Sequence, residues 1–386
     1  MTAKRFLFVV PPLAGHVHPT ISVARALQSR GHHVAWVGYP LVKEYLPEGA
    51  ILHALDGAMS AGDWDRLLER SRGVRGLESF QFLWQEVLVP LARAMMPGVE
   101  RVIEAERPDV LVVDHQAIAG ALVARKRQLP WATLCTTSAS VVDTLTDLPK
   151  VKQWVDAQLR ELEARAGLTP TPSPDLSPSR VIVFSTEALV GSERPFPSHY
   201  RFVGPSIADR PDSTAFPWES LSPLPRVFVS LGTVSAEVAA PFYATLVTAL
   251  ADLEAQVIVA APPNLFPDPP KSFLVQARVP QLALLPHCAA VVCHGGHNTV
   301  CESLANGLPL VVAPIRDDQP VVAQQVTRAG AGIRVRYGRL PPTVLREAVL
   351  RVLGEPQYRE AARRIGASFA AAGGASAAAD DLESLS

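Results

Sequence analysis

Short, continuous apolar runs alternate with helical patterns along this chain, and this alternation restricts the possible fold more than any other feature. Phe6–Val10 is typical of a strand buried on both faces. Thr20–Arg30 follows with the apolar spacing of a helix ended by Gly31, and Val34–Val37 predicts a second strand. Because a strand–helix–strand unit joins parallel strands, the sequence predicts an α/β fold built on parallel sheets.

The alternation occurs in both halves of the chain. The further strands that we expect are Val110–Val113, Trp131–Cys135, Val181–Phe184, Arg226–Ser230, Gln256–Ala260, Ala289–Val292, Leu310–Ala313 and Gly332–Val335. Between the halves, 11 of the 56 residues from 170 to 225 are proline. Proline cannot donate a backbone hydrogen bond, so this stretch favours loops that end in a linker.

The predicted organisation is therefore two Rossmann-like parallel-sheet domains. The first covers residues 1–205, a linker covers 206–222, the second domain covers 223–365, and a C-terminal helix or tail covers 366–386. We expect the two domains to face each other across a cleft, with ligands near the carboxyl ends of the strands. No GxGxxG motif follows the first strand of either domain and no GxxxxGK[ST] loop occurs, which argues against hydride transfer and P-loop hydrolysis.

Composition narrows the class of protein further. The 386 residues include 36 Lys+Arg and 37 Asp+Glu, and this balance argues against a nucleic-acid partner, which usually requires a basic excess. A hydrophobic content of 48% excludes a disordered chain, and four cysteines are too few for a disulfide scaffold. The sequence shows no signal-peptide pattern and no apolar stretch of about 18 residues, so we expect a cytoplasmic protein with no membrane partner.

The segment from Cys288 to Gln319 contains the richest motif. His294-Gly295-Gly296 follows a buried strand and precedes a helix that we expect to run from about Asn298 to Ala305. Glycines let the backbone approach a ligand closely, and the first N–H groups of a helix, at the positive end of its dipole, suit a phosphate. A plain strand-to-helix turn is the alternative, but the paired glycines beside a histidine donor favour an anion site.

Glu302 in the same segment has two open interpretations. Thr299-x-x-Glu302 matches a capping box, in which the carboxylate serves only the start of the helix. Alternatively, the carboxylate accepts hydrogen bonds from ribose hydroxyls beside a bound diphosphate.

A zinc site in this segment is not predicted, although five histidines and cysteines occur close together in the sequence. They are His287, Cys288, Cys293, His294 and His297. An extended strand separates the first two from the rest, and no CxxC pair is present.

A second candidate centre follows the first strand, in an expected loop that contains His16 and His18. A histidine there can take a proton from a bound hydroxyl when a carboxylate orients it. Asp114, at the carboxyl end of its strand, emerges at the same edge of the sheet, whereas Asp109 begins that strand at the far edge. The alternative is that one of the histidines only caps the following helix, and the residues leave the two interpretations balanced.

Two further segments contain candidate ligand contacts. Asp317-Asp318-Gln319 follows a strand and offers donors and acceptors suited to a polyhydroxylated ligand, with a solvated acidic turn as the alternative. Phe82 and Trp84 lie in the expected helix Ser79–Met95. They are candidates for an apolar acceptor pocket, although core packing is the more common use of such residues.

Taken together, these residues resemble the GT-B-fold, nucleotide-sugar-dependent glycosyltransferases, especially the bacterial natural-product (macrolide and antibiotic) branch. The donor signature of that family runs from a Pro-Gln segment through His-x-Gly to Asp-Gln. Here Val279-Pro280-Gln281, His294-Gly295-Gly296 and Asp318-Gln319 occur in that order. The similarity is strong over residues 225–332, good over residues 6–40, and weak between them.

The resemblance implies a nucleotide-sugar site in the second domain. The implied contacts to base and ribose are Val279, Gln281 and Glu302. The implied contacts to the diphosphate are Thr233, His294, Gly295, Gly296, Asn298 and Thr299. The sugar hydroxyls would meet Asp318 and Gln319, and Thr136 falls near a threonine that approaches the sugar. Arg278 stands where the family usually has a base-stacking aromatic residue, and a guanidinium can also stack.

The resemblance also implies the reaction. His16 matches the general base of the family's N-terminal loop, with Asp114 as its candidate partner; the first domain would bind the acceptor and the second the donor. The expected activity is inverting, metal-independent transfer of a hexose from UDP- or dTDP-sugar to a hydroxyl of an apolar natural product such as a polyketide or macrolide antibiotic, with no other cofactor. The alternatives are a nucleotide-sugar 2-epimerase of the same fold and a non-catalytic nucleotide-binding protein.

Overall fold

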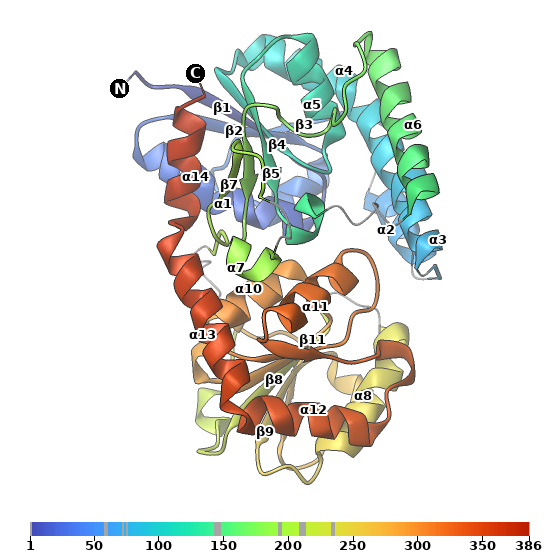
Figure 1. The fold of residues 1–386 in the computed structure, drawn as a ribbon, viewed down its shortest axis with the longest axis vertical. Helices are drawn as coiled ribbons and strands as arrows, with labels where there is room; N and C mark the ends of the chain where they lie inside the picture. The colour runs from blue at the N-terminus through green and yellow to red at the C-terminus, as the bar shows by residue number, and fades with distance from the viewer. Residues whose placement is uncertain are drawn as a thin grey trace. The chain divides into compact units, whose positions relative to one another are not determined.

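The computed structural model describes residues 2–57, 61–71, 73–74, 76–142, 148–191, 195–207, 214–232 and 236–385. The chain forms two compact units, each built on its own parallel sheet (Figure 1). The first unit comprises Met1–Thr186, Ser192–Ala208 and Ala372–Ser386, and the second comprises Glu187–Gly191 and Asp209–Ala371. The predicted fold class, two parallel-sheet α/β domains, is confirmed.

The sheet of the first unit has seven parallel strands in the order β3-β2-β1-β4-β5-β6-β7. The strands are β1 (Arg5–Val9), β2 (His33–Gly38), β3 (Leu52–Ala54), β4 (Val110–Asp114), β5 (Trp131–Cys135), β6 (Val181–Val183) and β7 (Tyr200–Phe202). The helices are α1 (Ala14–Ser29), α2 (Ala61–Ser71), α3 (Leu77–Phe82), α4 (Val89–Glu106), α5 (Ile118–Lys126), α6 (Pro149–Ala166) and α14 (Gly374–Glu383). Because β1, β4 and β5 are neighbours, their carboxyl ends meet at one edge of the sheet.

The sheet of the second unit has six parallel strands in the order β10-β9-β8-β11-β12-β13. The strands are β8 (Arg226–Ser230), β9 (Gln256–Ala260), β10 (Phe273–Gln276), β11 (Ala290–Cys293), β12 (Leu310–Val312) and β13 (Gly332–Arg334). The helices are α7 (Glu187–Val190), α8 (Ala236–Leu250), α9 (Gln281–Leu284), α10 (His297–Ala305), α11 (Gln319–Arg328), α12 (Pro342–Gly354) and α13 (Pro356–Ala371).

Alternate residues of each central strand fill separate cores on the two faces of its sheet, as the two-residue period of a strand requires. In β1, Phe6 and Phe8 join the core that α1 and α14 cover, whereas Leu7 joins the core that α4 and α5 cover. In β8, Val227 packs toward α8 and α12, and Phe228 packs toward α10, α11 and α13. The continuous apolar runs in the sequence are therefore strands buried on both faces.

Every strand predicted from an apolar run is present, with ends shifted by no more than one residue. Three strands were not predicted: β3, β7 and β10. All three lie at sheet edges and are three or four residues long. The expectation of loops alone after Val181–Phe184 in the proline-rich stretch is wrong, because α7 and β7 lie there; both elements are free of proline, so their backbone donors are intact.

The Ala-rich end of the chain, expected as one helix or tail over 366–386, consists of the last turns of α13 followed by α14. Gly373 has a φ of +88°, a conformation that favours glycine, and it separates the two helices. Arg30 at the end of α1 donates hydrogen bonds to Asp380 and Glu383 of α14, so the C-terminal helix belongs to the first unit. In the described part of the chain, no helix has both the length and the apolar character needed to cross a membrane.

Candidate active site

The first candidate centre lies at the carboxyl edge of the seven-stranded sheet and draws on three neighbouring strands. His16 follows β1, Asp114 is the last residue of β4, and Thr136 directly follows β5. Side chains that are distant in sequence meet here because the sheet order places β4 between β1 and β5.

His16 lies on a helix and not in a loop, which corrects the expectation from the sequence. α1 begins at Ala14, so His16 is in its first turn. Pro19 lies inside the helix and removes the N–H that would bond to the carbonyl of Gly15. The helix tolerates this loss of one hydrogen bond near its start, whereas in the sequence Gly15 and Pro19 indicate a loop.

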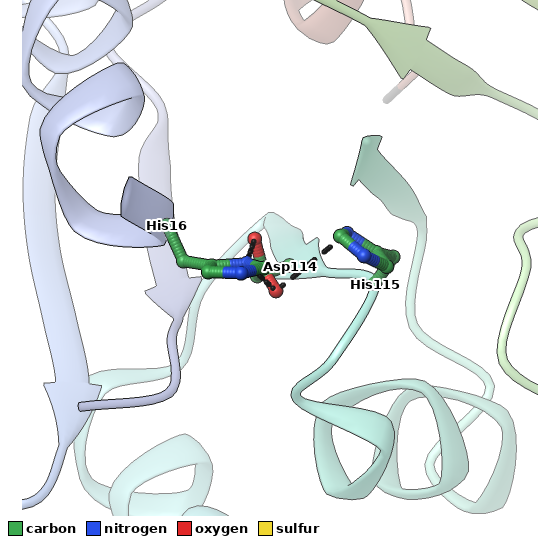
Figure 2. A group of neighbouring side chains, drawn as sticks. All are labelled: His16, Asp114 and His115. Atoms are coloured by element: carbon green, nitrogen blue, oxygen red, sulfur yellow. Dashed lines mark hydrogen bonds and ion pairs between the residues drawn. The ribbon is translucent and has the colours of Figure 1, made fainter. Parts of the chain in front are cut away.

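The structure brings His16 and Asp114 into direct contact. Nδ1 of His16 is 2.9 Å from Oδ1 of Asp114, and the two side chains face each other (Figure 2). The Thr136 hydroxyl donates to Oδ2 of Asp114 at 3.0 Å and lies 2.9 Å from Nδ1 of His16. Thr136, which the resemblance placed near the sugar, is therefore part of the cluster around this carboxylate.

Asp114 is fully buried, yet its surroundings favour the ionised form. Burial alone would raise the pKa of Asp114. The neighbouring His16 and His115 and a hydrogen bond from the Gln116 backbone N–H act in the opposite direction and hold this pKa below its ordinary value. An ionised carboxylate can only accept hydrogen bonds, so the proton between the two residues belongs to Nδ1 of His16. Nε2 is then the atom of the imidazole that can take a proton.

His115 was not singled out in the sequence. Its Nδ1 lies 3.8 Å from Oδ1 of Asp114, and its ring centroid is 5.2 Å from that of His16. Figure 2 shows the carboxylate of Asp114 lying between the two imidazole rings. The only signal available in the sequence was that His115 directly follows Asp114 at a strand end.

The second candidate centre lies in the other unit, in the turn from β11 to α10. Gly295 has a φ of +92°, and a Cβ atom there would lie 2.9 Å from Val312 and 3.2 Å from the backbone oxygen of Gln319. A Cβ atom on Gly296 would lie 2.6 Å from Nε2 of His294. Both glycines therefore let the turn pack tightly against its neighbours.

His294 is the polar side chain of this turn. Its Nδ1 is buried and makes no hydrogen bond with any described residue. Burial lowers the pKa of His294, and this effect is only partly offset by the charge of Asp318 and a hydrogen bond with the Ser230 backbone. Nε2 of His294 lies beside Gly296, the N-cap of the nine-residue helix α10, and the positive end of a helix is an environment that favours a bound anion.

The capping-box interpretation of Glu302 is wrong. α10 begins at His297 with Gly296 as its N-cap, so Thr299 is already inside the helix and Glu302 lies in the second turn. The Glu302 carboxylate instead accepts a hydrogen bond of 2.5 Å from Nε2 of Gln281, at the start of α9. Two residues that the resemblance assigns to base and ribose are thus joined in the structure, and Glu302 is 4% exposed.

The Asp318-Gln319 pair marks the start of α11. Asp318 is the N-cap residue, without a side-chain capping bond. Oε1 of Gln319 accepts hydrogen bonds from the backbone N–H groups of Ile315 and Arg316, at 2.8 and 3.1 Å. The amide oxygen of Gln319 therefore holds the loop before the helix, and its NH₂ group is the part left to meet a ligand.

Three further candidate donor contacts lie at the start of α10 and in the loop before α9. Asn298 and Thr299 lie in the first turn of α10, and Val279, in the loop before α9, packs on the core beneath that helix. Thr233 lies outside the described residues. Among the described residues, the five histidines and cysteines of residues 287–297 do not gather into a group of three potential metal ligands.

Phe82 and Trp84 lie where α3 ends and a π-helical turn, Leu83–Leu88, leads into α4. The expected single α-helix over Ser79–Met95 is therefore interrupted. Both aromatic side chains are half-buried: Trp84 packs on the core between α4 and α6, and Phe82 contacts the guanidinium of Arg70.

Replacing Gly295 tests how tightly the turn before α10 is built. We expect Gly295→Ala to reduce the stability of the protein by about 1–3 kcal/mol through backbone strain alone, with a further loss from the contact to Val312. Thermal unfolding measures the effect, and Gly49→Ala is the matched control because Gly49 also has positive φ but an open Cβ position. A Gly295→Ala protein no less stable than the Gly49→Ala protein would contradict the close packing of this turn.

Comparison with known proteins assigns the family. Residues 244–385 match the family model described as "Erythromycin biosynthesis protein CIII-like, C-terminal domain". The chain is 30% identical to the elloramycin glycosyltransferase ElmGT of Streptomyces olivaceus, over 94% of this chain and 92% of that protein. It is 29% identical to the uncharacterized UDP-glucosyltransferase YojK of Bacillus subtilis (strain 168), over 96% of this chain and 95% of the relative.

Among solved structures, the calicheamicin glycosyltransferase CalG4 is similar over 100% of this chain and 98% of its own, with a TM-score of 0.80 and 26% identity. Together with the two parallel-sheet units, these findings show that the chain belongs to the GT-B-fold, nucleotide-sugar-dependent glycosyltransferases of the natural-product branch. The protein is a glycosyltransferase.

Proposed function

We propose that the protein transfers a hexose from UDP- or dTDP-sugar to a hydroxyl group of an apolar natural product, with inversion at the anomeric carbon and without a metal cofactor. The single observation that carries this proposal is the hydrogen bond between His16 and the buried carboxyl group of Asp114. A histidine held in this way can remove the proton of an attacking hydroxyl near neutral pH.

In the proposed reaction, the acceptor hydroxyl binds to the first unit beside Nε2 of His16. Nε2 takes the hydroxyl proton while the oxygen attacks the anomeric carbon and the bond to the diphosphate breaks. Asp114 stabilises the imidazolium that forms, and Thr136 holds the carboxylate in place. Attack from the face opposite the leaving group inverts the anomeric configuration.

The second unit is proposed to bind the nucleotide sugar. The N-terminus of α10 and the imidazole of His294 would take the diphosphate, and they stabilise the negative charge that grows as the sugar leaves. Glu302, oriented by Gln281, would accept hydrogen bonds from ribose hydroxyls, and the NH₂ group of Gln319 would donate to a sugar hydroxyl. These groups supply the charge stabilisation for which other glycosyl transfers use a cation.

The acceptor class is proposed from the aromatic segment before α4. Phe82 and Trp84 offer half-buried apolar surface at the π-helical turn, a type of irregularity that is frequent at functional sites. The chain is similar to glycosyltransferases named for elloramycin and calicheamicin, and this similarity supports a natural-product acceptor of the polyketide or macrolide type.

The experiment that tests the proposed function is product analysis with UDP-glucose and dTDP-glucose, each with a panel of polyketide and macrolide acceptors, in the presence of EDTA. We expect a glycoside of opposite anomeric configuration to the donor. A donor-alone reaction is the control for the epimerase alternative: an epimerised nucleotide sugar without acceptor would contradict the proposal, and so would transfer that requires an added metal.

A further inference from the structure

We propose that His16, Asp114 and His115 form a binding site for a divalent transition-metal ion of the zinc type. We further infer that an ion bound there stops glycosyl transfer by occupying the base. The second statement rests on the proposed function of His16, whereas the first depends only on the geometry of the three side chains.

The geometry suits a small ion. One ligand atom from each side chain can be chosen so that all three lie within 4.8 Å of one another. Nδ1 of His16 and Nδ1 of His115 are 2.9 and 3.8 Å from Oδ1 of Asp114. Tetrahedral zinc with bonds of about 2.0–2.1 Å places its ligands roughly 3.3 Å apart, between the two observed separations. Figure 2 shows the Asp114 carboxylate between the two imidazole rings, with a contact to each ring.

The chemistry of the ligands favours zinc over magnesium. Two imidazole nitrogens and one carboxylate oxygen are a donor set that Zn²⁺ binds readily, while a fourth position stays open for water. Mg²⁺ prefers oxygen ligands in octahedral geometry and has little affinity for imidazole. In the part of the chain that the structure describes, no other three His, Cys, Asp or Glu side chains gather in this way.

Burial and access are also consistent with a metal site. The carboxylate of Asp114 is fully buried, whereas the side chains of His16 and His115 are 14% and 11% exposed. A buried carboxylate between two histidines attracts a cation with little competition from solvent, and the two partly exposed rings border that carboxylate.

An ion at this site would replace the proton on Nδ1 of His16, and that proton is released to solvent. The hydrogen bond between His16 and Asp114 is then lost. The positive charge of the ion makes Nε2 a weaker base, so the acceptor hydroxyl keeps its proton and transfer stops. Nucleotide binding in the second unit uses none of these residues and is expected to continue.

Calorimetric titration of ZnCl₂ into the full-length protein, without nucleotide or chelator, tests the site. We expect His115→Asn to weaken binding by at least about tenfold, because even outer-shell partners of a metal contribute that much affinity. His18→Asn is the control. His18 lies on α1, the helix of His16, and contacts the ring of Tyr45, so the His18→Asn protein should bind zinc like the wild type. MgCl₂ should give no comparable binding. Equal zinc affinity in the wild type and His115→Asn would overturn the proposal.

Two further measurements, cobalt absorption and zinc inhibition of transfer, distinguish failure of the metal site from failure of the proposed function. Co²⁺ in place of Zn²⁺ gives visible absorption bands that report nitrogen ligation without any turnover, and loss of these bands in His115→Asn would support the site. In transfer assays, inhibition by Zn²⁺ should need at least about tenfold more metal in His115→Asn than in the wild type. Metal binding that requires His115 but leaves transfer unaffected would keep the metal site and count against His16 as the base.

Discussion

Replacement of His16 by alanine is expected to lower kcat for glycosyl transfer by about 10²–10⁴-fold, the usual contribution of a general base. The physical reason is that His16 is the histidine of the described cluster that forms a hydrogen bond with Asp114, at 2.9 Å. Nδ1 of His115 lies 3.8 Å from the same carboxylate oxygen, too far for a hydrogen bond that would replace it. Steady-state rates at saturating donor measure this loss. The affinity for UDP or dTDP should stay the same, because the proposed diphosphate contacts lie in the other unit.

His18→Ala is the matched control for this substitution. His18 lies two residues further along α1 and contacts the ring of Tyr45. A general loss of helix stability would affect both variants, whereas loss of the base affects only His16→Ala. Turnover of His16→Ala close to that of the wild type would remove the base from the proposed mechanism.

The second large effect is expected for Asp114→Asn. The carboxylate accepts the Nδ1 proton of His16, and an amide in its place can donate to Nδ1 instead. The imidazole would then carry its proton on Nε2 and could not accept one from the acceptor hydroxyl. Rates should fall by at least about 10²-fold, as expected when an aspartate that orients a histidine is replaced by asparagine.

Asp114 is fully buried, so the test needs a measure of folding. Nucleotide affinity and the thermal unfolding of Asp114→Asn provide it, because a folded variant should still bind the donor nucleotide. Asp109→Asn is the control, since Asp109 precedes the same strand and accepts a hydrogen bond from the backbone of Arg5 at the opposite edge of the sheet. Full activity of a folded Asp114→Asn protein would show that His16 needs no carboxylate.

The central strands could be predicted from the sequence because they are buried on both faces, and that burial requires continuous apolar runs such as Phe6–Val10. The edge strands could not. Leu52–Ala54 and Tyr200–Phe202 are short and partly exposed, so neither apolar composition nor alternation distinguishes them from loops. Their place in the sheet depends on pairing with β2 and β6, which is a long-range contact.

The candidate site, like the fold, could be predicted from the sequence only in part. The order and spacing of residues made His16, Asp114 and His294 candidates, because each lies at or just after the carboxyl end of a strand. The sequence could not predict which side chains pair. The hydrogen bond between Gln281 and Glu302 joins two helices, and a difference of three residues in the N-cap of α10, Thr299 or Gly296, decides whether Glu302 can cap that helix. His115 also became visible only through its distance to Asp114.

The most direct test of the account is calorimetric titration of UDP and dTDP into the wild type, His294→Ala and His16→Ala, with EDTA present. We expect at least one nucleotide to bind the wild type without metal and to bind His16→Ala equally well. His294→Ala should lose about 1.5–3 kcal/mol of binding free energy, the usual contribution of a hydrogen bond to a charged group, or roughly 10–100-fold in affinity. Absence of binding by either nucleotide, or unchanged affinity in His294→Ala, would contradict a donor site at the start of α10.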